Sequence, residues 1–250
     1  MNPVKAVLFD FDGTISTLRH GWEKIMEPLM IELLGEDARE TIRVYIDEST
    51  GIQTIFQMKW LAQQVEARQG KAQDPWEYKA EYNRRLMEMV KKRRDTLANG
   101  SASREDYMIA GSEAILKALT GMGAKLYVAS GTDDPDVKAE VEALGLTKYF
   151  TKIAGAPIGK ENCSKEKVIR DLLDTGIPGG ELAVVGDGKV EIMVGRENGA
   201  RTLGLASNEE ARQGIDLVKR ERLVRAGADV IVGDFLDKDQ LIKFFSGEQV

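Results

Sequence analysis

Two aspartates separated by one residue, Asp10 and Asp12, directly follow the apolar residues 6–9 and precede Gly13. A short apolar run that ends at polar residues and a glycine is typical of a buried strand. Residues i and i+2 of a strand point to the same side, so both carboxylates should project together from one end of a sheet. Paired carboxylates repel each other unless a cation or a proton shares their site. The pair therefore indicates chemistry rather than packing.

Two further apolar runs are followed by groups that could take part in the same chemistry. Residues 125–129 precede Ser130 and Gly131, which offer a hydroxyl and a free amide to a phosphate group. A later run precedes Asp187, and Glu191 follows four residues on, in the first turn of a predicted helix. These two carboxylates could both face a hard cation.

A loop between these two motifs is rich in lysine. It carries Lys160, Lys165 and Lys167, and an ammonium group here could neutralise a phosphoryl group or a nucleophilic carboxylate. Each of the three could equally be a solvated surface charge. The loop by itself therefore leaves the choice among them open.

The elements that position these groups alternate between strands and helices from about residue 107 onward. The predicted strands are 125–130, 151–156, 182–186, 201–205 and 229–232, and the predicted helices are 112–122, 135–144, 164–174, 190–198 and 215–226. Gly145, Gly176 and Gly199 lie where three of these helices should end. With the strand before Asp10, the pattern predicts a mostly parallel sheet flanked by helices, with ligands at the carboxyl ends of its strands.

Between the first strand and about Arg104 the sequence has helical periodicity and almost no strand pattern. Apolar residues spaced for helices are Ile25, Leu29 and Leu33, then Ile55 and Val65, then Tyr78, Tyr82, Leu86 and Met89. Pro28 should kink or divide the first of these helices. We therefore expect an α/β core, residues 1–16 and 105–250, interrupted after its first strand by a helical insert, residues 17–104. An insert at this point would lie over the catalytic edge of the sheet as a lid.

Length and composition narrow the class of protein. The 250 residues suffice for a domain with an insertion, and 42% hydrophobic with 30% charged residues is ordinary for a globular protein. The net charge of −6 disfavours nucleic acid and anionic membranes as partners. No apolar run is long enough to span a membrane, and the early first strand leaves no room for a signal peptide. Cys163 has no intrachain partner, which favours a cytoplasmic location, and monomer and homodimer both stay open.

Taken together, the motifs resemble those of the haloacid dehalogenase-like phosphohydrolase superfamily. The matching stretches are DFDGT at 10–14, VASGT at 128–132, the lysine of SKEKVI at Lys165, and GDGKVE at 186–191. The chain looks like the branch that contains phosphoglycolate phosphatase and β-phosphoglucomutase. That resemblance implies a Rossmann-like core with an α-helical cap inserted after the first strand. It also selects Lys165 among the three lysines, by its spacing to the following helix.

The resemblance implies that Asp10 is the nucleophile and becomes an aspartyl-phosphate, and that Asp12 protonates the leaving oxygen and then activates water. Lys165 would stabilise the developing charge. Asp10, the Asp12 backbone carbonyl and Asp187 would hold Mg²⁺, with water and substrate phosphate as further ligands. Glu191 stands where the family usually has aspartate and is also expected at the metal, either as a direct ligand or as a neighbour of the groups that bind it. An ordinary aspartate pKa of about 3.9 would leave Asp10 ionised at neutral pH.

The resemblance also suggests which residues contact the substrate. Ser130 and the Gly131 amide would bind phosphate oxygens, together with Thr14 of the first motif. Arg19 and His20 follow that motif where the chain leaves the core, and either could reach the substrate. The alternative for His20 is a hinge or surface position.

The function implied is a Mg²⁺-dependent phosphatase for a small phosphorylated metabolite such as phosphoglycolate or a sugar phosphate. The alternatives are a phosphomutase of the same superfamily and a non-catalytic binding or regulatory module on the same fold. Phosphonate hydrolysis is disfavoured because Lys24 matches only loosely the cap lysine that it needs. Residues 50–54 are either a specificity loop or an ordinary turn. The basic residues 84–85 and 91–94 are interpreted mainly as a solvated helix face.

Overall fold

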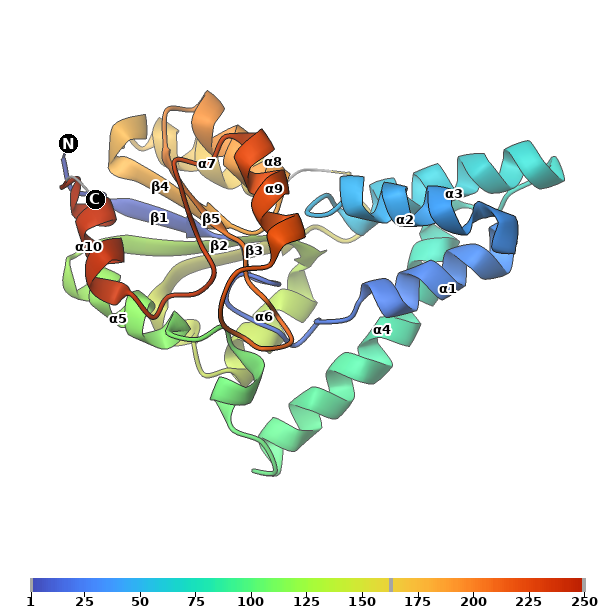
Figure 1. The fold of residues 1–250 in the computed structure, drawn as a ribbon, viewed down its shortest axis with the longest axis horizontal. Helices are drawn as coiled ribbons and strands as arrows, with labels where there is room; N and C mark the ends of the chain where they lie inside the picture. Colours follow the sequence, from blue (N-terminus) through green and yellow to red (C-terminus); the bar gives the residue numbers. More distant parts are fainter. Residues whose placement is uncertain (1, 162–163, 249–250) are drawn as a thin grey trace.

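The computed structural model describes residues 2–161 and 164–248, so Cys163 lies outside the described residues. Within these residues, the central feature is a six-stranded sheet in which each neighbouring pair is parallel. The strands lie in the order β3 (Phe150–Ala156), β2 (Lys125–Asp133), β1 (Ala6–Phe9), β4 (Leu182–Gly186), β5 (Arg201–Leu205) and β6 (Val230–Val232). Figure 1 shows β1 and β2 in the middle of this part of the molecule. The predicted parallel α/β core is confirmed.

Helices cover both faces of the sheet. They are α5 (Ser112–Gly121), α6 (Asp134–Ala143), α7 (Ser164–Asp174), α8 (Lys189–Glu197), α9 (Leu217–Ala226) and α10 (Lys238–Ser246). Strand side chains alternate, so Val7 and Phe9 of β1 pack in one hydrophobic core with α5, α6 and α10. Ala6 and Leu8 pack in another with α7. Burial on both faces explains why β1 is apolar throughout.

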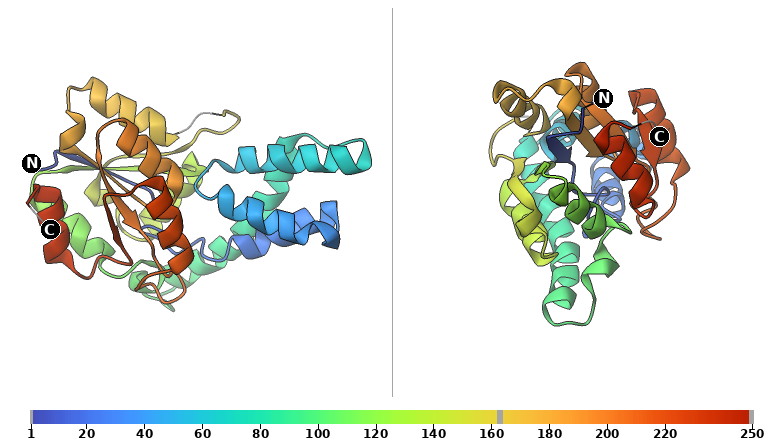
Figure 2. Two further views of the ribbon diagram at one scale, coloured as in Figure 1. Left: turned by 45° about the horizontal axis from the view of Figure 1, so that its top comes forward. Right: turned by 90° about the vertical axis from the view of Figure 1, so that its left-hand side faces the viewer.

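Four helices follow β1 and surround a separate hydrophobic core. They are α1 (Glu23–Leu34), α2 (Arg39–Glu48), α3 (Thr54–Gln69) and α4 (Pro75–Ala98). In Figures 1 and 2 they extend away from the carboxyl ends of the strands. Helix α4 begins sharply because the Asp74 carboxylate accepts the Trp76 N–H and Pro75 takes the first helical position. We retain residues 17–104 as the proposed bounds of this insert.

Some elements differ from those predicted. Pro28 lies inside α1, which continues on both sides, so of the two expected effects, a kink or a division, it does not divide the helix. Helix α2 was not separated from its neighbours because only Ile42 and Ile46 of it are buried, a stripe too short for periodicity to reveal. Helix α10 was not predicted, and β2 continues beyond Ser130 to Asp133. The predicted helix ends are confirmed by positive φ values of 66°, 86° and 72° at Gly145, Gly176 and Gly199.

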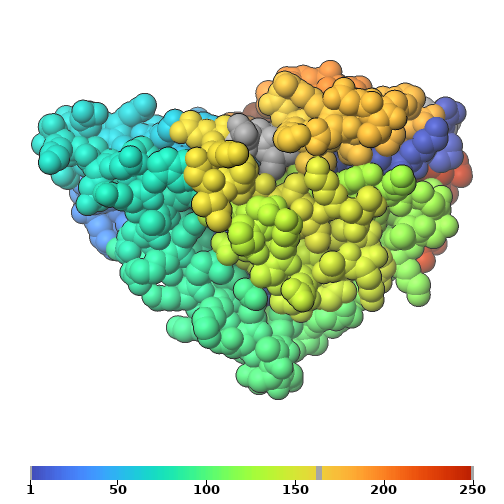
Figure 3. Space-filling model, turned by 180° about the vertical axis from the view of Figure 1, so that it is seen from behind, coloured from blue at the N-terminus to red at the C-terminus, as the bar shows by residue number. Residues whose placement is uncertain are grey.

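Ion pairs join the insert to the core. They are Lys79–Asp133 at 2.5 Å, Lys59–Glu161 at 2.5 Å and Arg222–Asp47 at 3.0 Å. Figure 3 shows, from behind, the loop before Glu161 in yellow against the helices of the insert. These contacts hold the helices over the edge of the sheet. No helix within residues 2–161 and 164–248 combines the length and hydropathy needed to cross a membrane.

Three basic residues of α4, Arg84, Arg85 and Lys91, form ion pairs with acidic neighbours on the same helix, as in Arg84–Glu81 at 2.8 Å. Arg93 is different, because its Nη1 donates to the backbone carbonyls of Leu18 and His20 at 2.8 and 2.9 Å. Arg93 therefore fixes the segment through which the chain leaves the core.

Candidate active site

Asp10 follows the central strand β1, between the ends of β2 and β4. Its backbone N–H donates to the Val185 carbonyl at 2.8 Å, which fixes the residue to the neighbouring strand. The chain continues to β2 on one side of β1 and reaches β4 on the other, so β1 is a topological switch point. Open parallel sheets bind ligands at such points. The groups after β1, β2 and β4 therefore meet at one edge.

Lys165 joins two of the predicted carboxylates. Its Nζ lies 3.2 Å from Asp10 Oδ2 and 2.7 Å from Glu191 Oε2, and all three side chains are buried. Burial raises the pKa of Asp10 well above its ordinary value, against the opposing charge of Lys165. The expectation of ordinary acidity for Asp10 is therefore wrong, because that expectation ignored burial. An ionised Asp10 needs a further cation beside it.

Asp187 is held from two sides. Thr14 Oγ1 lies 3.5 Å from Oδ1, and Lys219 Nζ lies 2.7 Å from Oδ2. Thr14 is fully buried and does not line the cavity, so it contacts Asp187 in place of the expected phosphate. Lys219 also lies 2.6 Å from Glu209, whose pKa falls to about 2 despite burial because His20 and Lys219 favour its charged form. His20 does not line the cavity either, and its Nδ1 is 3.6 Å from Glu209 Oε2.

The carboxylates fit a divalent cation. One oxygen each of Asp10, Asp187 and Glu191 lies within 4.8 Å of the others, and hard oxygen donors suit Mg²⁺. Both oxygens of Glu191 already accept hydrogen bonds, from the Gly188 N–H at 2.6 Å and from Lys165. Glu191 therefore holds Lys165 in place. A cation would relieve the repulsion among the carboxylates of Asp10, Asp187 and Glu191.

Asp12 faces the phosphate-binding segment. Its Oδ2 accepts hydrogen bonds from Thr132 Oγ1 at 2.8 Å and from Ser130 Oγ at 3.3 Å. Its Oδ1 is buried and makes no hydrogen bond to any described residue. Asp12 thus lines the cavity with one oxygen bonded to the segment 130–132 and the other without a hydrogen-bond donor among the described residues. Its side chain is not among the clustered carboxylates, so only its backbone carbonyl stays a candidate metal ligand.

Arg19 lies on the other side of Asp12, with Nε 3.8 Å from Oδ1. Its guanidinium donates to Glu140 through Nη2 at 2.6 Å and through Nε at 3.2 Å. Glu140 belongs to α6 and has no exposed surface. Burial raises its pKa to about 7, against the effect of Arg19. Arg19 is thus a cavity residue whose charge is already matched by a buried carboxylate.

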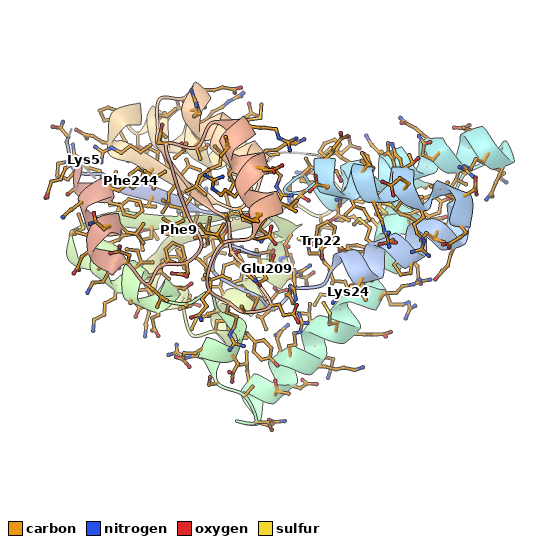
Figure 4. All side chains as sticks on the ribbon, viewed as in Figure 1. Lys5, Phe9, Trp22, Lys24, Glu209 and Phe244 are labelled. Atoms are coloured by element: carbon orange, nitrogen blue, oxygen red, sulfur yellow. The ribbon has the colours of Figure 1, made fainter. Side chains whose placement is uncertain are left out.

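A cavity of about 110 Å³ lies between the edge of the sheet and the insert. Its lining includes Asp10, Asp12, Arg19, Ser130, Gly131, Lys165 and Asp187 from the core motifs and the linker, and Trp22, Thr50, Gly51, Ile52, Thr54, Gln57, Tyr82 and Leu86 from the insert. A Cβ on Gly131 would lie 3.2 Å from the Ile52 carbonyl, so the loop 50–54 closes tightly over the phosphate-binding segment. Figure 4 shows Trp22 and Glu209 at this junction. The volume is below the roughly 300 Å³ of a drug-sized site, which favours a small ligand.

The structure separates the candidate lysines. Lys165 is buried in the site, whereas Lys160 is exposed and Lys167 pairs with Asp171 at 2.9 Å on the surface of α7. Lys24 is exposed on α1 and does not line the cavity. The choice of Lys165 therefore agrees with its position.

The sequence pattern gave no indication of a role in the site for Thr132, Glu140, Glu209, Lys219 or Tyr82. The position of Glu140 does signal burial, because this residue lies on the same face of α6 as Val137 and Val141, where an apolar residue is expected. Glu209 and Lys219 lie in a strongly charged stretch without a distinctive spacing. Only the fold brings them to Asp187.

Comparison with known proteins agrees with this geometry. A family model described as haloacid dehalogenase-like hydrolase matches residues 4–199. A 5'-nucleotidase from Pseudomonas aeruginosa is 22% identical over 200 residues, covering 80% of this chain and 81% of that protein.

Solved structures share the fold. A predicted phosphoglycolate phosphatase from Haemophilus somnus is 15% identical with a TM-score of 0.65, over 96% of this chain and 99% of that one. A β-phosphoglucomutase from Clostridium difficile is 14% identical with a TM-score of 0.65, over 96% of both chains. The predicted superfamily, and the fold of its branch with an inserted helical cap, are confirmed. The chain belongs to the haloacid dehalogenase-like hydrolases.

Proposed function

We propose that the protein is a Mg²⁺-dependent phosphatase that hydrolyses a small phosphorylated metabolite through a phosphoryl group on Asp10. The observation that carries the proposal is the 3.2 Å contact between Asp10 and Lys165, beside Asp12 in one small cavity. A carboxylate that could act as nucleophile, an ammonium group and a second carboxylate that could donate a proton thus share one space, which supports the proposal. The name of the 5'-nucleotidase relative supports hydrolysis of a phosphate ester.

In the first step, an oxygen of Asp10 attacks phosphorus, the ester P–O bond breaks, and Asp12 gives its proton to the leaving oxygen. In the second, Asp12 takes a proton from water, which attacks the phosphoryl group and releases phosphate with Asp10 restored. Lys165, held by Glu191, neutralises charge on the transferred group throughout. Mg²⁺, held by Asp10, Asp187 and the Asp12 carbonyl, would supply the remaining positive charge that the reaction needs.

Substrate binding would divide between the two sides of the cavity. Ser130 and Gly131 would bind the phosphate oxygens, and Arg19 with the loop 50–54 would face the leaving group. A cavity of about 110 Å³ supports a small metabolite rather than a macromolecule. The cytoplasmic location and the monomeric or homodimeric state stay predictions.

A phosphomutase is the second candidate, supported by the likeness to a β-phosphoglucomutase over 96% of the chain. It would use the same Asp10 but return the phosphoryl group to a substrate hydroxyl, with little net release of phosphate. A non-catalytic binding module is disfavoured, because the buried carboxylates and Lys165 are costly to keep without chemistry to perform.

Phosphate release from a panel of small esters tests the proposal, with and without Mg²⁺. The panel includes phosphoglycolate, sugar phosphates, nucleoside monophosphates and p-nitrophenyl phosphate. Asp10→Asn should lower turnover by about a thousandfold or more, because the amide is a poor nucleophile. Asp239→Asn, the same change at an exposed position of α10, is the matched control and should have no effect. Release that persists in Asp10→Asn, or after thorough chelation, would refute the mechanism.

A further inference from the structure

The positive charges at the cavity are already matched by carboxylates. In the described chain the basic residues that line it are Arg19 and Lys165. Arg19 donates to Glu140 at 2.6 Å, and Lys165 lies between Asp10 and Glu191 at 3.2 and 2.7 Å. Neither side chain is more than 10% exposed, so neither reaches bulk solvent. A second anionic group on a ligand would find no unmatched cation here.

Negative charge in fact exceeds positive charge around the cavity. The carboxylates that line it or bond to its lining are Asp10, Asp12, Asp187, Glu209, Asp136, Glu140 and Glu191, and the Lys and Arg cations are Arg19, Lys165, Lys219 and Arg222. A substrate phosphate dianion and one Mg²⁺ cancel each other and leave this excess unchanged. The excess persists even when Asp12 is protonated as the general acid. A carboxylate on the leaving group would therefore be buried against like charge.

The insert offers a neutral polar group at the same place. Tyr82 lines the cavity and is 3% exposed, yet its hydroxyl makes no hydrogen bond to any described residue. Burial raises the pKa of Tyr82, so the hydroxyl stays protonated and can donate. Tyr82 lines the cavity together with Arg19 and Asp12, so its hydroxyl belongs to the same small space as these two groups. The hydroxyl is not among the fully buried unpaired polar atoms of the described residues, so it is accessible at the cavity, where a ligand hydroxyl could accept its hydrogen bond.

We propose that this site takes phosphate monoesters whose leaving group is uncharged and carries a hydroxyl, and that it rejects those whose leaving group carries a carboxylate. The inference rests on the proposed phosphatase function and narrows its substrate class. Polyol and sugar phosphates belong to the accepted class, whereas phosphoglycolate does not. Tyr82 would bind the hydroxyl of the leaving group. A carboxylate on the leaving group would gain no ion pair, because Glu140 already neutralises Arg19.

Two esters of the same size separate these classes. 2-Hydroxyethyl phosphate and 2-phosphoglycolate share a two-carbon skeleton and differ by a CH₂OH group in place of the carboxylate. Each is used as a competitive inhibitor of p-nitrophenyl phosphate hydrolysis in excess Mg²⁺ near pH 8, where Glu140 is ionised. Competition yields an inhibition constant whether or not the ester itself is turned over. The hydroxyl ester should bind at least about tenfold more tightly than the carboxylate.

Three variants assign the preference to residues. Glu140→Gln keeps a hydrogen-bond acceptor for Arg19 but leaves the guanidinium charge unmatched. A ligand carboxylate could then pair with Arg19, so the variant should reduce the ratio of the two inhibition constants by several-fold. Glu142→Gln, the same change at an exposed position of α6, should leave the ratio unchanged. Tyr82→Phe should weaken 2-hydroxyethyl phosphate by about two- to tenfold while leaving ethyl phosphate, which lacks the hydroxyl, unchanged.

The outcomes distinguish the two levels of the proposal. Equal inhibition constants, or tighter binding of 2-phosphoglycolate, would overturn the inference while p-nitrophenyl phosphate hydrolysis upholds the phosphatase. An unchanged constant for 2-hydroxyethyl phosphate in Tyr82→Phe would overturn the hydroxyl contact. Absence of p-nitrophenol release by the wild type, or its persistence in Asp10→Asn, would instead refute the phosphatase mechanism on which the inference rests.

Discussion

The ammonium group of Lys219 lies 2.7 Å from Oδ2 of Asp187, although the two residues come from different elements of the core. The same group lies 2.6 Å from Glu209 and 3.1 Å from Ser207. A cation from α9 thus shares the acidic edge of the sheet with Lys165. Lys219 thereby reduces the repulsion among the carboxylates at this edge. Without it, a bound metal would have to offset that repulsion alone.

Lys219→Met should destabilise the protein by about 3 kcal/mol without Mg²⁺, because it leaves the buried Asp187 and Glu209 without their cation. Mg²⁺ should restore part of the loss and bind more tightly than in the wild type. Urea unfolding with and without Mg²⁺ measures both effects. Arg220→Met removes an exposed charge from the same helix and serves as control. Equal stability of Lys219→Met and the control would show that Lys219 has no such role.

Gly13→Ala should impair both stability and activity. A Cβ at this position would lie 2.4 Å from Asp187 Oδ2, and φ is +71°. Gly100 has a similar φ of +74° but nothing within 4 Å of its Cβ position, so Gly100→Ala reports the backbone strain alone, about 1–2 kcal/mol. Gly13→Ala should exceed this value and also weaken Mg²⁺ binding. Identical unfolding free energies for the two variants would contradict the close approach to Asp187.

Lys79→Met should weaken the hold of the insert on the core. Lys79 lies 2.5 Å from Asp133, and Asn83 donates to the same carboxylate at 2.9 Å. Loss of the ion pair should raise KM by about tenfold and change kcat less, because closure over the substrate becomes less favourable. Steady-state kinetics with an accepted ester gives both constants. Lys138→Met, which breaks the exposed pair with Asp134, should leave KM as it is.

The stability of the wild type should fall relative to Glu140→Gln as the pH rises from about 4.5 to about 7. The pKa of Glu140 is about 7 in the folded protein, above its ordinary value of 4.5, so the folded state binds more protons between these limits. Glutamine does not titrate. The difference in the free energy of unfolding should therefore shift by up to about 3 kcal/mol in favour of the variant and stay constant above pH 7. Urea unfolding across this range is the measurement, and a pH-independent difference would exclude a titrating Glu140.

The meeting of Asp10, Ser130 and Asp187 could be predicted from the sequence. Each follows an apolar run typical of a buried strand, and the carboxyl ends of parallel strands lie at one edge of a sheet. Lys165 could be chosen only through the resemblance to a family, because its loop holds three lysines. The altered pKa of Asp10 could not be predicted, since it depends on burial and on neighbours from other elements.

The contacts that close the cavity were harder to predict from the sequence. The contact of Ile52 with Gly131 depends on how the insert docks, which local periodicity does not encode. The pairing of Arg19 with Glu140 joins residues 121 positions apart. Pro28 does not divide α1, because the packing of this helix against its neighbours outweighs the local free-energy cost of a proline.

The strand order also has a consequence for biosynthesis. Ala6 of β1 pairs with Lys125 of β2 and with Leu182 of β4, and both partners follow the whole insert along the chain. Strand β1 therefore waits unpaired until the insert has been made, whereas the four helices contact near neighbours and can pack first. The length and folding rate of the insert thus set how long an aggregation-prone strand stays exposed in the nascent chain.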